Sequence, residues 1–491
     1  TDKTSSKMKR IYGAEQPFTP LGPFKLRIPF VHYKFEWADY VQGLLVCAVC
    51  LSAVPMLQEY LGMPFDIAIT IVILNGILYC THVLLGDPVV PGWVTPAIPI
   101  LILYVNQFDP GPDRMHALIA FEFLLGLLAF VLGITGLGKK MIKIVPAAMQ
   151  SGIIVGAGIA AVVVVFKTGS HFDKTPWTIA ICMGIGFFLL FSNTFRVMAE
   201  RNKIAKFIAN MGILPIMVLA VILGPLVFET PWPTVEWGLV KPNFIGVWRD
   251  WTIFGLGLPP ARMFISAIPV VVSTYIVLFG DMIQAQALIE DCAEKRPDEK
   301  VDYNPNRSHI IFGMRNMTMS IIGPDLTMCG PLWAAMQVVI CDRYKKGPKA
   351  MESIHSGAGS FRFGTLTGYF LLPIVTLVKP ILGVALASTL LIQGFVSFRV
   401  GVSKARTSID LGIAGVMAAI LASRGAAWGL GGGIVMSLLL LMPMRKHKNT
   451  ADLSEAEHGK EREGSIATIG KTAIEAQSEH QMARETVEVE Q

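Results

Sequence analysis

Charged residues are scarce in this sequence. Only 16% of its 491 residues are Asp, Glu, Lys or Arg, while 53% are hydrophobic; a soluble domain carries about 25% charged residues. The stretch 446–491 is polar and charge-rich, so residues 38–443 are more apolar still. No soluble fold has enough interior for that many apolar side chains. The sequence therefore predicts a polytopic membrane protein and excludes a soluble enzyme, a secreted disulfide scaffold and a nucleic-acid-binding domain.

Cysteine is also sparse, and no spacing among the seven cysteines suits a zinc site or a disulfide in an outer loop. Cys47 and Cys50 form a CxxC pair, but they lie in an apolar segment, where packing explains them. The sequence shows no nucleotide-binding loop, metal motif or catalytic triad, and residues 1–37 have no apolar core of a signal peptide. We therefore expect a protein that is not an enzyme and has no cofactor other than a coupling ion.

Apolar segments of about 20 residues, the length that crosses a bilayer, recur along the chain. Full-length candidates are 38–59, 64–85, 115–137, 142–166, 176–193, 204–228, 261–285, 364–379, 381–398, 408–423 and 427–443. Three further stretches, 93–105, 308–322 and 331–341, are too short or too broken to span alone. Together they predict an all-α fold with 14 membrane segments.

Lysine and arginine set the expected orientation. The net charge of +6 comes from basic residues in short loops, the bias of cytoplasmic faces, rather than from a nucleic-acid surface. If the chain starts in the cytoplasm, the basic loops fall on the cytoplasmic side. These loops are 139–143, 196–206, 295–296, 343–346 and 399–406. This predicts a multi-pass protein of the cell membrane with both termini cytoplasmic.

The predicted segments fall into two halves of seven. Because seven is odd, the second half crosses the membrane in the opposite sense to the first, as in the inverted repeats of many transporters. The predicted parts are a cytoplasmic segment 1–37, a first repeat 38–228, an extracytoplasmic loop 229–260, a second repeat 261–443 and a cytoplasmic tail 444–491.

The third segment of each half carries a related motif. VTPAIP (94–99) and LTMCGP (326–331) each precede a short apolar run. Proline favours the first turn of a helix, so each motif predicts an extended strand leading into a half-helix. Unwound backbone in a membrane must line a cavity or be buried, and paired interrupted segments point to a transport site. The predicted substrate-binding residues are Thr95, Ala97, Ile98, Thr327, Cys329 and Gly330.

Ionisable residues inside membrane segments are costly and usually functional. We expect Asp281 to hold a coupling H⁺ or Na⁺, with Asp325 as a second acid, Arg315 as their charge partner and Tyr275 lining the cavity. The alternatives are a helix end for Asp281, a turn aspartate for Asp325, and a structural ion pair or outer-face position for Arg315.

Three polar residues are weaker candidates for the site, and one of them is expected near the outer interface. These are Asn75, Gln284 and, at the interface, Glu122.

Three stretches resemble the nucleobase–ascorbate transporters (uracil and xanthine permeases), which share a fold with sulfate permeases and anion exchangers. They are IVPAAMQSGIIVGAGI (144–159), AIPVVVSTYIVLFGDMIQAQALIED (267–291) and NPNRSHIIFGMRNMTMSIIGPDLTMCG (304–330). The resemblance implies 7+7 inverted repeats, core and gate domains, elevator motion and a homodimer. The tail is too short for the STAS domain of sulfate permeases.

Two departures from the nucleobase pattern direct the choice of substrate. The family has a glutamate four residues before its Gly-Asp pair, and this chain has Val277 at that position. The family also has an acidic or amide residue after a later glycine, whereas in this chain Pro331 follows Gly330. Without these side chains, the two half-helix N-termini become the main recognition element, and they favour an anion.

The sequence therefore predicts a cation-coupled symporter for a small carboxylate, sulfonate or oxyanion. A nucleobase:H⁺ symporter and a passive anion channel are the alternatives. The expected partners are the small-molecule substrate, the lipid bilayer and a second copy of the chain.

Overall fold

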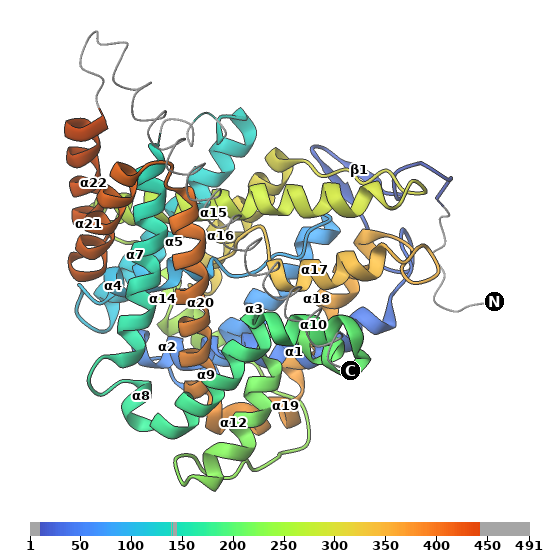
Figure 1. Ribbon diagram of the computed structural model, residues 1–491, viewed down its shortest axis with the longest axis horizontal. Coiled ribbons are helices and arrows are strands. Elements are labelled where there is room, and N and C mark those ends of the chain that lie inside the picture. Colours follow the sequence, from blue (N-terminus) through green and yellow to red (C-terminus); the bar gives the residue numbers. More distant parts are fainter. Residues whose placement is uncertain (1–9, 139, 141–144, 442–491) are drawn as a thin grey trace, which may run out of the picture. The chain divides into compact units, whose positions relative to one another are not determined.

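Helices make up most of the protein, as Figure 1 shows for the computed structural model, which describes residues 10–138, 140 and 145–441. The described residues up to Ser437 form one unit by their contacts, and the description below concerns this unit. Lys139, Lys143 and the predicted tail 444–491 lie outside the described residues.

The first part of the chain opens with a hairpin and continues as helices. Its elements are β1 (Thr19–Leu21), β2 (Phe24–Leu26), α1 (Trp37–Cys50), α2 (Ala53–Leu61), α3 (Phe65–Leu84), η1 (Thr95–Ala97), α4 (Ile98–Val105), α5 (Pro112–Thr135), α7 (Ala147–Phe166), α8 (His171–Lys174), α9 (Pro176–Phe191), α10 (Asn193–Arg201), α11 (Lys203–Asn210) and α12 (Leu214–Leu226). The short antiparallel hairpin β1–β2 lies in the segment before the first predicted membrane helix, and the predicted helical membrane fold is confirmed.

The regular elements described in the second part are all helices. Its elements are α13 (Phe244–Asp250), α14 (Ile253–Leu256), α15 (Ala261–Glu294), α16 (Pro305–Ile322), α17 (Ala334–Tyr344), α18 (Ile354–Phe370), α19 (Leu372–Val378), η2 (Lys379–Ile381), α20 (Leu382–Lys404), α21 (Ser408–Arg424) and α22 (Ala426–Leu441).

Several of these helices can cross a membrane. Six are long and apolar enough by themselves, and the number rises to eight if each of two bent helix pairs counts as one span. This confirms several membrane-crossing helices. Shorter helices such as α4 and α17 occupy other predicted segments, and the count of 14 segments in two inverted repeats stays a prediction.

Predicted span 204–228 is wrong as a single helix. The chain turns by 89° between α11 and α12. Gly212 at the turn has a φ of 57°, which suits glycine, and Pro215 lies in the first turn of α12. A helix can therefore start anew after Gly212 but cannot continue through it.

Predicted span 364–379 is also misplaced. Helix α18 starts at Ile354, where Ser353 forms a capping box, and ends before α19. Small and polar residues fill its first turns, so the sequence shows no apolar run there. Helix α15 likewise reaches Glu294 instead of ending at 285.

Glycines bring two pairs of helices into backbone contact. Helix α1 packs on α18 and α5 packs on α16. A Cβ built on Gly364 would fall on the carbonyl oxygen of Tyr40, and one on Gly126 would lie 2.7 Å from that of Gly313. Such contacts are typical of membrane helices, whose association depends on close packing.

We expect Gly364→Ala to lower the thermal midpoint of the purified protein. The added methyl group has no space, and overpacking costs about 1–3 kcal/mol. Gly412→Ala is the matched control, because a Cβ at exposed Gly412 meets nothing within 4 Å. If both variants melt alike, the α1–α18 contact is looser than described.

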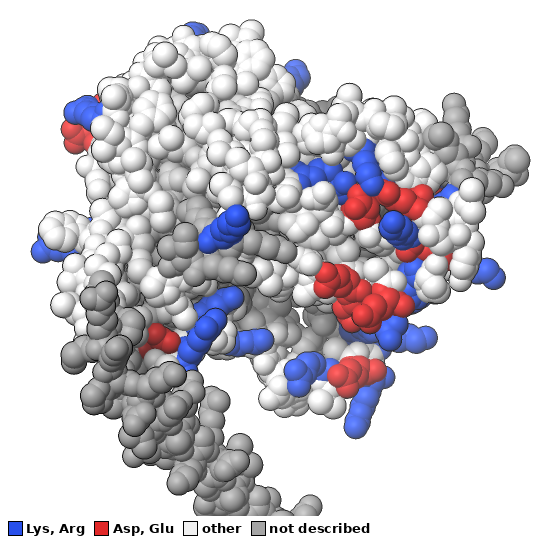
Figure 2. Space-filling view, turned by 90° about the horizontal axis from the view of Figure 1, so that it is seen from above, with Lys and Arg blue, Asp and Glu red and all other residues white. Residues whose placement is uncertain are grey.

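An ion-pair network joins the N-terminal segment to the loop between α15 and α16. Lys25 Nζ lies 2.5 Å from Asp302 and 2.7 Å from Glu15, Arg27 lies 2.6 Å from Glu15, and Arg10 lies 2.6 Å from Asp298. Figure 2 shows charged side chains gathered mainly on one part of the face it displays, with broad uncharged areas elsewhere. Residues 10–36 are therefore folded onto the helices and do not form a free extension.

Acid should weaken this network. Burial raises the pKa of the Asp302 carboxyl, but hydrogen bonds from Arg307 and Lys25 outweigh it and lower that pKa to about 2. An unfolded aspartate has a pKa of about 3.9, so the stabilisation is complete above that pH and is lost as pH falls toward 2. Asp302→Asn should remove this part of the acid dependence, measured as melting temperature between pH 5 and 2.5; an unchanged slope would contradict it.

All seven cysteines are buried and free of disulfide bonds. They therefore act as small apolar packing groups, as the sequence predicted for Cys47 and Cys50.

Candidate functional site

The two interrupted stretches predicted from their Thr/Pro motifs lie side by side. Gly92 and Gly330 form an antiparallel bridge, with Gly330 N–H donating to the Gly92 carbonyl oxygen at 2.7 Å. Further along, Trp333 N–H donates to Val90 O at 2.7 Å and Val94 N–H to Thr327 O at 3.3 Å. Each stretch thus satisfies buried peptide groups of the other, which non-helical backbone in an apolar environment requires.

The stretches end in short helices, as expected. Thr95 is half-buried in η1, and Ala97 and Ile98 are buried where η1 passes into α4. A Cβ on Gly92 would lie 2.8 Å from that of Trp333, the residue before α17, so glycine is needed at this crossing.

Thr327 and Cys329 turn their side chains toward α3 and α16. Thr327 Oγ1 bonds to Asp325 and accepts a hydrogen bond from Asn75 Nδ2 at 3.1 Å. Cys329 Sγ lies 3.2 Å from His82 Nε2. Among the predicted binding residues, Gly330 is the one whose backbone meets the other stretch directly at the bridge.

Asn316, which sequence reasoning missed, clamps Cys329. Its Oδ1 accepts from Cys329 N–H at 2.8 Å, and its Nδ2 donates to Cys329 O at 2.9 Å. The amide thus pairs with an extended residue as a neighbouring strand would. The polar Arg-Asn pair inside α16 was the available signal in the sequence.

Asp325 and Glu122 lie together in the interior. Glu122, expected near the outer interface, is fully buried, and its Oε2 accepts a hydrogen bond from Asp325 N–H at 3.2 Å. Asn75 donates to the Asp325 carboxylate. Two of the weaker sequence candidates therefore adjoin a principal one.

Arg315 does not form the expected ion pair within the described residues. Its Nη1 donates to Asn316 at 3.2 Å and its Nη2 to the Asn75 carbonyl oxygen at 3.5 Å. Its guanidinium carbon lies 4.5 Å from the ring centroid of Tyr79. Two hydrogen bonds and stacking on Tyr79 thus hold this buried guanidinium, and no carboxylate among the described residues lies within ion-pair distance of it.

A second buried arginine, Arg362 of α18, was missed by sequence reasoning. It is 1% exposed, and its Nε and Nη1 have no hydrogen-bond partner among the described residues. Its guanidinium carbon lies 4.3 Å from the ring centroid of Tyr79 and 5.1 Å from that of Trp333. The signal was an arginine among small residues at 357–364, a stretch that fell largely outside the predicted segments.

Asp281 and Tyr275 take different positions on α15. Asp281 is half-buried and has no hydrogen bond or ion pair in the described part of the chain. It lies on the same helix face as Leu288, two turns further on. The Leu288 carbonyl oxygen accepts a contact from Cys341 of α17. Tyr275 is buried, and its hydroxyl lies 2.9 Å from His309 Nε2 instead of near the crossing.

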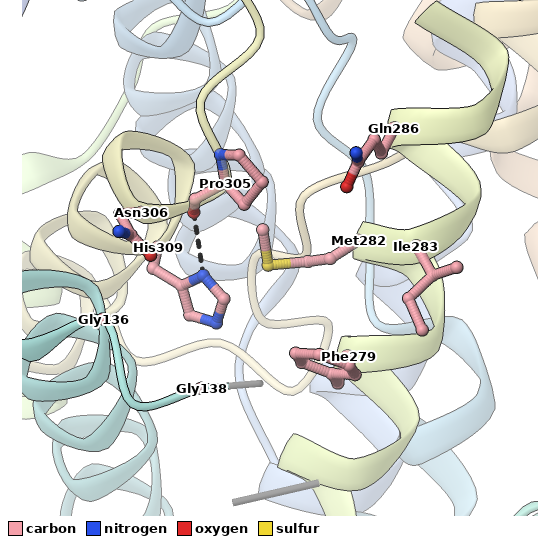
Figure 3. A pocket seen from close by; sticks show the side chains of 9 residues that line it. All are labelled: Gly136, Gly138, Phe279, Met282, Ile283, Gln286, Pro305, Asn306 and His309. Atoms are coloured by element: carbon pink, nitrogen blue, oxygen red, sulfur yellow. Dashed lines mark hydrogen bonds between the residues drawn. The ribbon is translucent and has the colours of Figure 1, made fainter. Parts of the chain in front are cut away.

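A pocket of about 210 Å³ opens beside that histidine. Figure 3 shows Phe279, Met282 and Gln286 on α15 facing Pro305 and His309 of α16. His309 Nδ1 donates to Pro305 O at 2.8 Å, so its Nε2 accepts from the Tyr275 hydroxyl. The pocket contains none of the charged groups near the crossing and is separate from them.

By structure, the chain is similar to the transmembrane domain of the cyanobacterial bicarbonate transporter BicA, with a TM-score of 0.53 and 15% identity, over 81% of this chain and 96% of that one. It is also similar to SLC26A9, with a TM-score of 0.51 and 15% identity, over 82% of this chain and 64% of that one.

Neither a protein-family model nor a curated protein sequence matches the chain. The structural likeness confirms the predicted fold shared by sulfate permeases and anion exchangers, whereas assignment to the nucleobase–ascorbate family is not confirmed.

Proposed function

We propose that this protein is a secondary active transporter that moves a small anionic solute across a membrane together with a cation. One observation carries the proposal: the buried guanidinium of Arg362, with two nitrogen atoms that lack a partner among the described residues, stands beside the crossing of the two unwound stretches. A buried charge is costly unless something compensates it. A bound anion would do so.

The chemistry suits a carboxylate or an oxyanion. Arg362 Nε and Nη1 point to different edges of the guanidinium, and each can donate a charge-assisted hydrogen bond to an oxygen of a bound anion. The N-termini of α4 and α17 add partial positive charge on the predicted binding residues Thr95, Ala97, Ile98 and Gly330. Bicarbonate, the ion that the similar protein BicA transports, belongs to this class.

Charge balance supports coupling to a cation. The ionisable side chains buried near the crossing include two acids and two arginines, Glu122, Asp325, Arg315 and Arg362. Two acids and two bases sum to zero when all are charged, so a bound anion leaves one excess negative charge. A proton or Na⁺ entering with the anion restores neutrality in a medium where charge is expensive.

Within the single compact unit, two groups of helices make their largest contacts among themselves, and we propose that these groups move relative to each other. Helices α1, α3, α16 and α18 pack among themselves, whereas α7 packs on α20 and α21, and α9 on α12 and α20. Elevator motion, a homodimer and the inverted repeat are part of the proposal. Asp281, on the face toward α17, is retained as a candidate coupling group.

Uptake into proteoliposomes tests the proposal. The purified full chain should accumulate labelled bicarbonate, sulfate or a small carboxylate down an imposed Na⁺ or H⁺ gradient, and uracil should not compete. Accumulation of uracil alone would favour the nucleobase symporter instead. Anion flux that follows only its own gradient and the voltage would favour the channel.

A further inference from the structure

Four oxygen-bearing side chains meet in the interior between α3, α5 and the stretch that follows α16. They are Asn75, Glu122, Asp325 and Thr327, and none is more than 4% exposed. Hydrogen bonds join them in a chain: Asn75 to Asp325 and Thr327, Thr327 to Asp325, and Asp325 N–H to Glu122 Oε2. Together they form the oxygen cluster discussed below.

Two acceptor atoms of the oxygen cluster are left without a donor. Glu122 Oε1 and Asn75 Oδ1 are buried and have no hydrogen-bond partner among the described residues. The donors of the cluster are already engaged, since the Thr327 hydroxyl and its N–H both bond to Asp325, the latter at 3.1 Å. Buried acceptors without a donor cost free energy, and a cation satisfies several of them at once.

The charge of the oxygen cluster points the same way. It contains two carboxylates, and neither makes an ion pair within 4.0 Å among the described residues. The Arg315 guanidinium donates to the Asn75 carbonyl oxygen at 3.5 Å and to Asn316, and to neither carboxylate. If the anion of the proposed function balances Arg362, the two carboxylates and Arg315 leave a deficit of one positive charge, which one monovalent cation would fill.

We infer that the oxygen cluster binds one dehydrated Na⁺ through Asn75 Oδ1, the Glu122 and Asp325 carboxylates and the Thr327 hydroxyl. Hard cations take oxygen ligands, and unwound backbone in transporters is where coupling ions bind. This inference rests on the proposed function and deepens it, because it assigns the coupling ion to this cluster instead of to Asp281. Thr327 and Cys329 lie on the stretch that crosses Gly92, so a bound ion would fix the backbone that faces the substrate.

Thermal stability of the purified full chain tests the site without transport. Preferential binding to the folded protein raises the melting temperature by mass action. Wild type should be stabilised saturably by NaCl and not by equal concentrations of KCl or choline chloride. Glu122→Gln should weaken the apparent Na⁺ affinity at least tenfold, whereas Asp113→Asn, an exposed acid on the same helix, should not change it.

A second pair of variants distinguishes the loss of the ion site from a general failure to fold. Thr327→Val removes the oxygen while keeping the shape, and Thr327→Ser keeps the oxygen; only the valine variant should lose the Na⁺ response. Equal stabilisation by Na⁺ and K⁺, an unchanged response in Glu122→Gln and Thr327→Val, or stabilisation by low pH alone would overturn the assignment.

The two proposals fail separately. Na⁺ stabilisation without any anion uptake would leave the site standing and remove the proposed function. Anion uptake driven by a proton gradient, without any Na⁺ effect on stability, would leave the function standing and remove the site.

Discussion

Arg362→Gln is expected to reduce anion uptake on the order of 100-fold or more, because hydrogen bonds to charged groups contribute about 1.5–3 kcal/mol each and this variant removes the charge from two of them. The glutamine keeps a shorter, uncharged polar side chain and loses the guanidinium that stacks on Tyr79 and Trp333. Initial rates of labelled-anion uptake in proteoliposomes, at several anion concentrations, measure the effect.

Two further variants make this result specific. Arg362→Lys keeps the charge but loses the planar fork of donors, so its uptake should fall between wild type and glutamine. Arg249→Gln removes an exposed arginine that pairs with Asp250 and should leave uptake unchanged. Wild-type rate and KM in Arg362→Gln would show that the unpartnered guanidinium does not meet the substrate.

Asn316→Ala is expected to abolish most uptake and to lower stability by about 2–5 kcal/mol, because both peptide groups of Cys329 lose their partner and each buried unsatisfied group costs about 1–3 kcal/mol. Since Asn316 acts through the backbone of Cys329, it is a positioning residue. Melting temperature and the KM of uptake should both change.

Comparison with two other substitutions separates positioning from general destabilisation. Asn316→Asp keeps the acceptor for Cys329 N–H and loses only the donor, so it should retain more uptake than alanine. Asn306→Ala changes an exposed asparagine of the same helix and should alter neither quantity. If Asn316→Ala melted lower but transported with unchanged KM, the clamp would be structural only.

The sequence predicts helices well where one property, a long apolar run, decides them. Predicted segments 64–85 and 408–423 differ by at most one residue at either end from α3 and α21. The failures occur where tertiary contacts decide. The first turns of α18 are small and polar because they pack on other helices, so hydropathy alone does not reveal them.

The candidate site shows the same division. Thr/Pro motifs predicted two interrupted stretches, because proline and glycine act locally. That Gly92 pairs with Gly330 is a long-range contact that only the inverted-repeat argument suggested. Arg362 was missed because what singles it out is the lack of hydrogen-bond acceptors around its guanidinium. The sequence does not show which groups surround a side chain. The resemblance to nucleobase carriers predicted the shared fold and left the substrate class as a proposal.

The burial of every native cysteine makes the unmodified chain a ready background for chemical mapping. Thiol reagents modify exposed thiolates, and none of the seven sulfur atoms lies on an exposed residue. A single cysteine introduced at the surface would therefore be the principal reactive position. Labelling of intact cells with a membrane-impermeant maleimide, one engineered position at a time, would show which loops face outward and whether any changes its accessibility when the transported anion is added.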